Sequence, residues 1–218
     1  PFPHKKQPFS TKSKAFLYKI DNNNIIGPSD DKLLNIDELS VPGEHNLQNF
    51  LAASTCSHLM GISQNQIVRT LKEFKGVEHR LEYVRTINEV EYINDSKATN
   101  INSVIVAINT YDQPIVLILG GFNKGANFRL LLPHIKSSHV RDIVSYGDAG
   151  GQINTALGDA VRSVQVTDLS SAVKEAQLMA APGDIVLLSP GCASYDEFSN
   201  FEERGNHFKS IIKNIAIS

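Results

Sequence analysis

The chain has 218 residues, and its 21 basic and 23 acidic side chains give a formal net charge of −2. Hydrophobic residues make up 41% of the sequence and charged residues 20%, which is typical of globular proteins and excludes general disorder. No apolar run approaches the roughly 18 residues that a membrane-spanning helix needs, and the near-neutral charge argues against a dedicated nucleic-acid-binding protein. Two cysteines are too few for a disulfide framework, so we expect a cytoplasmic protein.

The first 76 residues predict two short strands followed by two helices. The strands are expected at 15–20 and Asn24–Ile26. Asn46 is placed to cap the first helix, and Ser63 with Gln66 forms a capping box for the second. That second helix is expected to end at Gly76. We therefore expect a domain boundary there, which separates 1–76 from 77–218.

Beyond residue 76 the pattern changes to strands that alternate with helices. Short apolar runs, typical of strands buried on both faces, follow one another between helical segments. The expected strands are 81–86, Val90–Asn94, 115–119, 143–146, 164–166 and 185–188. The expected helices are 101–108, 128–136, Gly150–Leu157, 168–180 and a last one that begins at a capping box of Ser199 with Glu202. Strands joined through helices form a mostly parallel sheet, so the predicted fold is α/β and doubly wound.

Three polar segments directly follow strands of this predicted sheet. They are residues 95–100, 120–125 and 189–194. In an open parallel sheet, ligands bind beyond the carboxyl ends of the strands, beside the N-termini of helices. We therefore expect the three segments to open on one edge of the sheet and to form a binding crevice together.

The segment 95–100 offers three candidate side chains, each with a structural alternative. Asp95 is placed to accept hydrogen bonds from ribose hydroxyls, or to cap a helix. Lys97 could neutralise a phosphate, or remain a solvated loop lysine. Thr99 could bind a carboxylate, or cap the helix that begins near Asn100. Spacing alone does not separate these alternatives.

The other two segments indicate an anion site. Lys124 lies among glycines that let backbone amides approach an anion, although an ordinary tight turn has the same composition. Ala126 and Asn127 follow this segment, so it is not a phosphate loop of the G-x-x-x-x-G-K-[ST] type. Ser194 lacks a G-x-S-x-G context and a neighbouring histidine base, which favours carboxylate binding over nucleophilic catalysis.

Three further observations complete the candidate site. Arg80, preceded by His79, could bind a phosphate bidentately or form an interdomain ion pair. Phe201 belongs to a residue type that is more often core than ligand contact. The seven histidines are scattered without metal-ligand spacing, so no metal site is predicted. The residues alone thus indicate a crevice for an anionic small molecule beside a nucleotide, and they do not specify a reaction.

Four motifs, in order, resemble the Mur ligase family and in particular its D-glutamate-adding members. They are Gly43-Glu44-His45-Asn46-Leu47-Gln48-Asn49, His79-Arg80-Leu81-Glu82 with Asn94-Asp95-Ser96-Lys97-Ala98-Thr99-Asn100, Gly120-Gly121 with Lys124-Gly125, and Ser189-Pro190 with Cys192-Ala193-Ser194, Phe201-Glu202 and Arg204-Gly205. The resemblance covers residues 43–208. It implies a monomeric, ATP- and Mg²⁺-dependent ligase of cytoplasmic peptidoglycan precursor synthesis that binds neither nucleic acid nor membrane. ATP would phosphorylate the carboxylate of UDP-N-acetylmuramoyl-L-alanine, and the amine of D-glutamate would attack it and release phosphate.

The same resemblance implies roles for individual residues and for the two domains. Asn46 and Asn49 would face the adenine of ATP, Asp95 its ribose, and Arg80 and Lys97 its phosphates, and His79 would also belong to the ATP-binding residues. Thr99, Lys124, Ser194 and Phe201 would surround D-glutamate, and Lys97 and Lys124 would be the catalytic residues. Residues 1–76 would be the C-terminal portion of a central ATP-binding domain, and 77–218 a Rossmann-like C-terminal ligase domain.

Some features depart from the family pattern. Asn123 and Asn127 stand where many relatives carry aspartate, and Gly191 stands where alanine is usual. No phosphate loop, carbamylated-lysine segment or set of magnesium ligands is recognisable, so we expect these 218 residues to be a fragment that is inactive on its own. Two alternatives remain open: a folylpolyglutamate-type ligase of the same superfamily, and a non-catalytic α/β module that binds a nucleotide or an amino acid.

Overall fold

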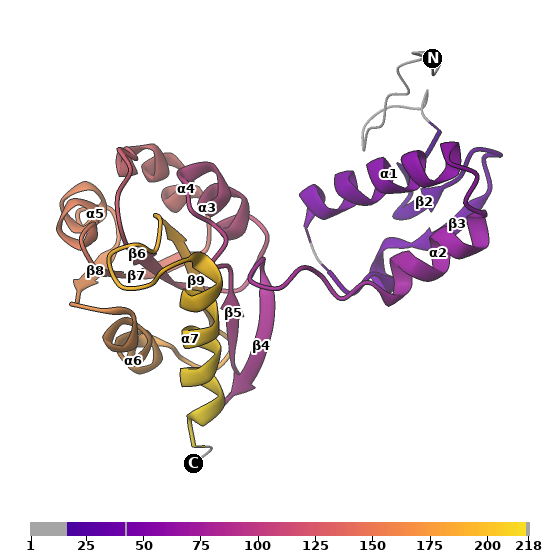
Figure 1. Ribbon diagram of the computed structural model, residues 1–218. Helices are drawn as coiled ribbons and strands as arrows, with labels where there is room; N and C mark the ends of the chain where they lie inside the picture. Colours follow the sequence, from indigo (N-terminus) through magenta and orange to yellow (C-terminus); the bar gives the residue numbers. More distant parts are fainter. Residues whose placement is uncertain (1–16, 42, 217–218) are drawn as a thin grey trace. The chain divides into compact units, whose positions relative to one another are not determined.

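The structure is a computed structural model that describes residues 17–41 and 43–216 (Figure 1). The chain divides into two compact units, Pro1–Gly76 and Val77–Ser218. Within the described ranges, no helix combines the length and the hydropathy that crossing a bilayer requires.

In the first unit, two helices pack on a three-stranded antiparallel sheet with the strand order β1-β2-β3. Its elements are β1 (Lys19–Asp21), β2 (Asn24–Ile26), β3 (Lys32–Asn35), the 3₁₀ helix η1 (Ile36–Glu38), α1 (Glu44–Leu59) and α2 (Gln64–Glu73). Ile25 and Leu34 from the sheet meet Leu51 of α1 and Ile67 of α2 in one core, which holds the small unit together.

The local predictions for this unit are partly confirmed. β2 and the capping box at Ser63 are confirmed. The first predicted strand lies at β1, later than expected, and residues 15 and 16 fall outside the described part of the chain. The prediction that Asn46 caps α1 is wrong, because this helix starts at Glu44 with Gly43 as its N-cap. The third strand was not predicted, because four residues are too short to show an alternating pattern.

The second unit is built on a six-stranded sheet with the order β4-β5-β9-β6-β7-β8. Neighbouring strands from β5 to β8 are parallel, and β4 is an antiparallel edge strand. The strands are β4 (Glu82–Ile87), β5 (Val90–Asn94), β6 (Ile115–Gly120), β7 (Val140–Tyr146), β8 (Arg162–Gln165) and β9 (Ile185–Gly191). The helices are α3 (Ile101–Ile108), the 3₁₀ helix η2 (Phe128–Leu131), α4 (Leu132–Ser137), α5 (Gly150–Leu157), α6 (Leu169–Met179) and α7 (Phe201–Asn214). The predicted α/β fold with a mostly parallel sheet is confirmed.

Two hydrophobic cores lie on the two faces of this sheet. Figure 1 shows α3, α4 and α5 on one face and α6 and α7 on the other. In the central strand β6, Ile115, Leu117 and Leu119 enter the first core, while Val116 and Ile118 enter the second. All five side chains are fully buried, which explains why the strand appears in the sequence as an uninterrupted apolar run.

Several helix boundaries in this unit differ from the prediction. The segment predicted as one helix over 128–136 is a 3₁₀ turn followed by α4, with Pro133 in the first turn of α4. The last helix is capped by Asn200, not Ser199, since the Asn200 side chain accepts a hydrogen bond from the N–H of Glu203 at 2.7 Å. Asn100 caps α3 in the same way, so Asp95 and Thr99 do not cap it.

Candidate functional site

The three predicted ligand-binding segments follow three neighbouring strands. β5, β9 and β6 lie side by side and run parallel, so residues 95–100, 189–194 and 120–125 all lie at the same edge of the sheet. The strands run further than predicted, because Gly120 still belongs to β6 and residues 189–191 to β9. Asp95, Ser194 and Lys124 are therefore brought to one edge of the second unit, which agrees with the expectation from the sequence.

A buried arginine joins two of these segments. Arg204, in the first turn of α7, is 0% exposed. Its guanidinium donates to Ser96 Oγ at 2.9 Å and to the Ser96 carbonyl at 2.8 Å. It also donates to the carbonyl oxygens of Cys192 and Ala193, each at 3.1 Å. Sequence analysis gave this residue no role, although it lies in the last motif, because its partners are about a hundred positions apart along the chain.

Backbone pairing joins the third segment to the same site. Phe122 donates to the Ala193 carbonyl at 2.9 Å, and Ala193 donates back to the Phe122 carbonyl at 3.1 Å. Beside this pair, Gly121 has a φ of +118°, and a Cβ atom there would lie 2.3 Å from the Ala193 carbonyl oxygen. The close approach of the two loops therefore requires glycine at this position.

The loop that presents Lys124 is shaped by Asn123. The Asn123 Oδ1 accepts hydrogen bonds from the backbone N–H groups of Gly125 and Ala126, at 2.9 and 2.6 Å. Its Nδ2 donates to the side chain of Gln152 on α5 at 2.7 Å. Asn127, the other departure from the family pattern, caps η2 through the N–H of Arg129. Both asparagines thus have a local structural role.

Lys124 itself is exposed, and its ammonium lies over an aromatic ring. The distance from Lys124 Nζ to the centroid of the Tyr195 ring is 4.7 Å. Lys97 is arranged similarly, with its Nζ 5.6 Å from the centroid of the Phe201 ring. Among residues 17–41 and 43–216, no carboxylate forms an ion pair with either lysine. A bound anion would therefore not compete with a carboxylate of the described residues for either lysine.

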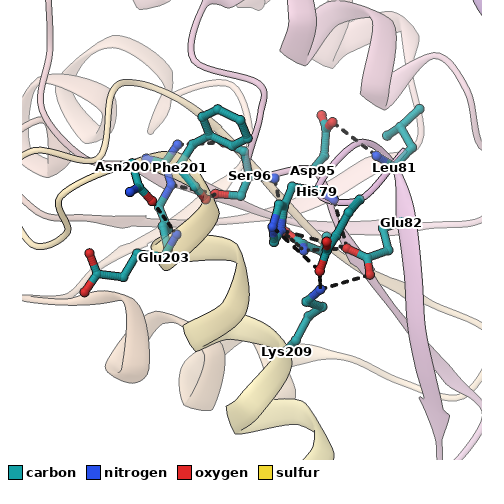
Figure 2. A network of polar contacts seen from close by, with 12 residues as sticks. His79, Leu81, Glu82, Asp95, Ser96, Asn200, Phe201, Glu203 and Lys209 are labelled. Carbon is teal, nitrogen blue, oxygen red and sulfur yellow. Dashed lines mark hydrogen bonds and ion pairs between the residues drawn. The ribbon is translucent and has the colours of Figure 1, made fainter. Parts of the chain in front are cut away.

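Arg80 is presented by a turn with two left-handed residues. His79 has a φ of +63° and Leu81 a φ of +45°. The backbone N–H of His79 donates to Glu82 at 2.9 Å, and the His79 carbonyl accepts from the N–H of Lys97 at 3.0 Å. Figure 2 shows this turn beside Asp95 and α7. The turn holds Arg80, which is exposed, next to the backbone of Lys97.

The His79 imidazole lies inside this network. It is 4% exposed, its Nδ1 is 3.0 Å from Asn94 Nδ2, and its ring meets Phe201 edge to face. A Cβ atom on Gly205 would lie 2.2 Å from Nδ1, so the ring packs directly on the helix backbone. Burial lowers the pKa of His79. The ring supports the turn in this structure, and its contact with a nucleotide stays a prediction.

Asp95 is also buried, at 4% exposure. Its Oδ2 accepts from the Ser189 hydroxyl at 2.8 Å and its Oδ1 from the N–H of Leu81 at 3.2 Å. Burial raises its pKa to about 7, against the lowering effects of these two hydrogen bonds and of the Arg80 charge. The carboxyl group therefore connects the ends of β5 and β9 to the turn that presents Arg80.

The remaining predicted residues differ in accessibility. Thr99 is exposed, Phe201 is half-buried and Ser194 is 2% exposed. Asn46 and Asn49 lie three positions apart near the start of α1, on one helix face of the first unit.

One group in the described part of the chain has metal-ligand geometry. Glu78, His79 and Glu82 offer ligand atoms within 4.8 Å of one another. The Lys209 ammonium, however, pairs with Glu78 and with Glu82, the latter at 3.1 Å (Figure 2). An ammonium ion already neutralises these carboxylates, so we assign no metal site to them.

The family comparison gives a match over the second unit. Residues 79–192 match the model of the Mur ligase, glutamate ligase domain. A relative from Clostridioides difficile, named UDP-N-acetylmuramoylalanine–D-glutamate ligase, is 44% identical over 200 residues, covering 90% of this chain and 44% of the relative. A protein of the same name from Pelotomaculum thermopropionicum is 47% identical over 178 residues, covering 81% of this chain and 39% of that protein. The chain thus spans less than half the length of these relatives.

Solved structures show the same fold at low sequence identity. UDP-N-acetylmuramate-alanine ligase MurC from Thermotoga maritima has a TM-score of 0.64 at 15% identity, covering 92% of this chain and 47% of that one. MurF from Acinetobacter baumannii has a TM-score of 0.64 at 14% identity, covering 93% and 46%. From the match to the domain model and from relatives above 40% identity, the chain belongs to the Mur ligase family.

Proposed function

We propose that this protein takes part in an ATP-dependent ligation that joins D-glutamate to UDP-N-acetylmuramoyl-L-alanine in the cytoplasmic synthesis of peptidoglycan precursors. The main observation in support is the convergence of Lys97, Thr99, Lys124 and Ser194 on one edge of the parallel sheet. The names of the relatives from Clostridioides difficile and Pelotomaculum thermopropionicum support the same reaction.

The nucleotide side of the proposed site consists of cationic groups on the 79–81 turn and the 95–100 loop. Arg80 and Lys97 are exposed and lie on backbone segments joined by a hydrogen bond, which suits the adjacent phosphates of ATP. Both carboxyl oxygens of Asp95 already accept a hydrogen bond, one from Ser189 and one from Leu81. We therefore expect a ribose hydroxyl to use only the acceptor capacity that remains on these oxygens. We assign Asn46 and Asn49 to the adenine.

Mg²⁺ is part of the proposed reaction, since it neutralises the phosphate charge of ATP. It prefers octahedral oxygen ligands and several waters. The Glu78–His79–Glu82 group does not fit this preference, because it includes an imidazole and is paired with Lys209. No Mg²⁺ ligand is therefore assigned within the described residues.

The amino-acid side of the proposed site is the Lys124 loop together with the 192–200 segment. D-Glutamate has two carboxylates and one amine, so a binding site must neutralise negative charge without blocking the amine. Lys124 supplies a cation, and Thr99 and Ser194 each supply a hydroxyl. Phe201 closes the apolar side. The chemical contribution of these groups is to orient the amine towards the activated carboxylate of the other substrate.

We assign residues 1–76 to the C-terminal portion of an ATP-binding domain and 77–218 to the ligase domain, and we expect the enzyme to act as a monomer.

The experiment that tests the proposed function is an ATP-dependent ligation assay with UDP-N-acetylmuramoyl-L-alanine and either D- or L-glutamate, on the product of the complete reading frame. We expect turnover with D-glutamate and none with L-glutamate. Preference for L-glutamate would favour the folylpolyglutamate type, and no turnover with either would refute the proposal. Turnover by the 218 residues alone would contradict the need for a phosphate loop.

A substitution at Lys124 tests the amino-acid side separately. A charge-assisted hydrogen bond is worth about 1.5–3 kcal/mol, so Lys124→Ala is expected to reduce kcat/KM for D-glutamate by about 10- to 150-fold. The KM for ATP should be unchanged. Arg129→Ala, which removes another exposed cation of the same loop region, is the matched control. Equal effects of the two substitutions would remove Lys124 from the site.

A further inference from the structure

Tyr195 is a large aromatic residue that the fold leaves uncovered. It is 61% exposed at the same edge of the sheet as Lys124, directly after the buried Ser194. The Lys124 ammonium lies 4.7 Å from the centroid of its ring. Neither hydrophobic core of this unit includes Tyr195, so core packing does not explain this aromatic residue.

The pairing of Tyr195 with Lys124 is set by the backbone. Phe122 and Ala193 form an isolated antiparallel bridge, with hydrogen bonds of 2.9 and 3.1 Å between their backbones. Lys124 and Tyr195 each lie two residues after a member of this bridge. The loop with Lys124 is fixed further by Asn123, and the loop with Tyr195 by Arg204, whose guanidinium holds the carbonyls before it. Ammonium and ring are thus brought together from two rigid supports.

An aromatic ring holds an ammonium ion differently from a carboxylate. The ring attracts the cation through its quadrupole and leaves the positive charge in place. A carboxylate would neutralise it and would compete with an anionic ligand. Lys97 lies over the Phe201 ring at 5.6 Å, so both proposed anion-binding lysines have an aromatic neighbour, and both rings come from residues 195–201.

We infer that Tyr195 is a positioning residue that orients the Lys124 ammonium towards a carboxylate of the amino-acid substrate. This assignment rests on the proposed function. Tyr195 acts through its ring face on Lys124, so its phenol hydroxyl is dispensable for the effect. Lys124 is otherwise a flexible, solvated side chain. When Tyr195 holds its ammonium in place before the substrate binds, less conformational entropy is lost on binding.

The test first detects the contact between Lys124 and Tyr195 by NMR and then measures its effect on substrate binding. The 218-residue chain is labelled with ¹³C at the lysine Cε atoms, and the Lys124 signal is assigned with Lys124→Arg. In the wild-type chain, the ring current should move the Lys124 ε-CH₂ proton signals upfield, and Tyr195→Leu should abolish that shift. Tyr195→Phe should retain it. Tyr83→Leu, which changes a similarly exposed tyrosine on β4 (58% exposed), is the control and should leave the signal in place.

The same samples are titrated with D-glutamate. Removal of an exposed cation–π contact is expected to weaken D-glutamate binding by about two- to fivefold in Tyr195→Leu, while Tyr195→Phe binds like the wild-type chain. A Lys124 signal that does not respond to Tyr195→Leu would overturn the inference, as would equal affinities of the two chains. If the wild-type chain does not respond to D-glutamate at all, this assignment is overturned, whereas the proposed function is decided separately by the ligation assay on the product of the complete reading frame.

Discussion

The Asp95 carboxylate accepts a hydrogen bond at 3.2 Å from the backbone N–H of Leu81, a residue with a left-handed φ of +45°. This contact, together with that to Ser189, places a buried acid under the turn that presents Arg80. The phosphate-binding groups of the proposed site thus depend on a carboxyl group that does not itself face solvent.

The first prediction concerns the pH dependence of stability. Burial raises the pKa of Asp95 from 3.8 to about 7. Between these two pH values the folded state therefore keeps a proton on this carboxyl group that the unfolded state releases. The contribution of Asp95 to stability is complete below pH 3.8 and is lost as the pH rises to about 7. Its slope can reach about 1.4 kcal/mol per pH unit. Asp95→Asn removes this slope.

Urea unfolding of the wild-type and Asp95→Asn chains between pH 4 and 8 measures the effect. The difference between their free energies of unfolding should change across this window and be constant above it. His79 and Glu197 also have shifted pKa values, but they are present in both chains and cancel in the difference. A constant difference throughout the range would show that Asp95 titrates normally.

The second prediction concerns Arg204. Arg204→Met leaves the carbonyls of Ser96, Cys192 and Ala193 buried without their donor, and a buried unsatisfied group costs about 1–3 kcal/mol. We expect a loss of at least about 3 kcal/mol in the free energy of unfolding. Arg204→Lys keeps the charge but cannot reach all three acceptors, so it should be intermediate. Lys213→Met, on the exposed side of the same helix, is the control and should have little effect.

The extent to which sequence analysis succeeds follows from the range of the interactions involved. β5 and α5 were predicted with their observed bounds, because each is fixed by local periodicity or by a buried apolar run. The edge of the sheet where the site lies also follows from topology. The caps expected at Thr99 and Ser199 lie one residue later, at Asn100 and Asn200, since neighbouring polar side chains could cap equally well.

The site residues that were missed depend on contacts between distant segments. Arg204 reaches Ser96 across 108 positions, and no local pattern indicates that an arginine in the first turn of a helix is buried. The Tyr195–Lys124 pair depends on the register of the Phe122–Ala193 bridge, which is likewise invisible in one sequence. The one indication in the sequence is the last motif, which is long enough to include both Arg204 and the neighbours of Tyr195.

The third prediction uses two glycines in the same loop region. Gly121 and Gly125 both have positive φ values, +118° and +92°, but only Gly121 lies against another backbone, with Ala193 O at 2.3 Å from the added Cβ. Gly125→Ala should therefore cost only backbone strain, about 1–3 kcal/mol. Gly121→Ala should cost clearly more, because it separates the Phe122–Ala193 bridge. Thermal unfolding and the amide signals of Phe122 and Ala193 measure this, and equal losses would contradict the close contact.

The fourth prediction concerns Asn123, whose side chain shapes the Lys124 loop. Asn123→Asp keeps the oxygen that accepts from Gly125 and Ala126, and Gln152 can rotate its amide to donate instead of accept. The stability should change by less than about 0.5 kcal/mol. Asn123→Ala loses both accepted bonds and should cost about 1–2 kcal/mol. Asn123→Asp also adds a negative charge beside Lys124, so D-glutamate affinity should fall below that of the wild-type chain, and this difference should shrink as salt is added. Urea unfolding and D-glutamate titrations at 50 and 500 mM salt separate the two effects, and an affinity unchanged at low salt would place the Lys124 ammonium beyond the influence of residue 123.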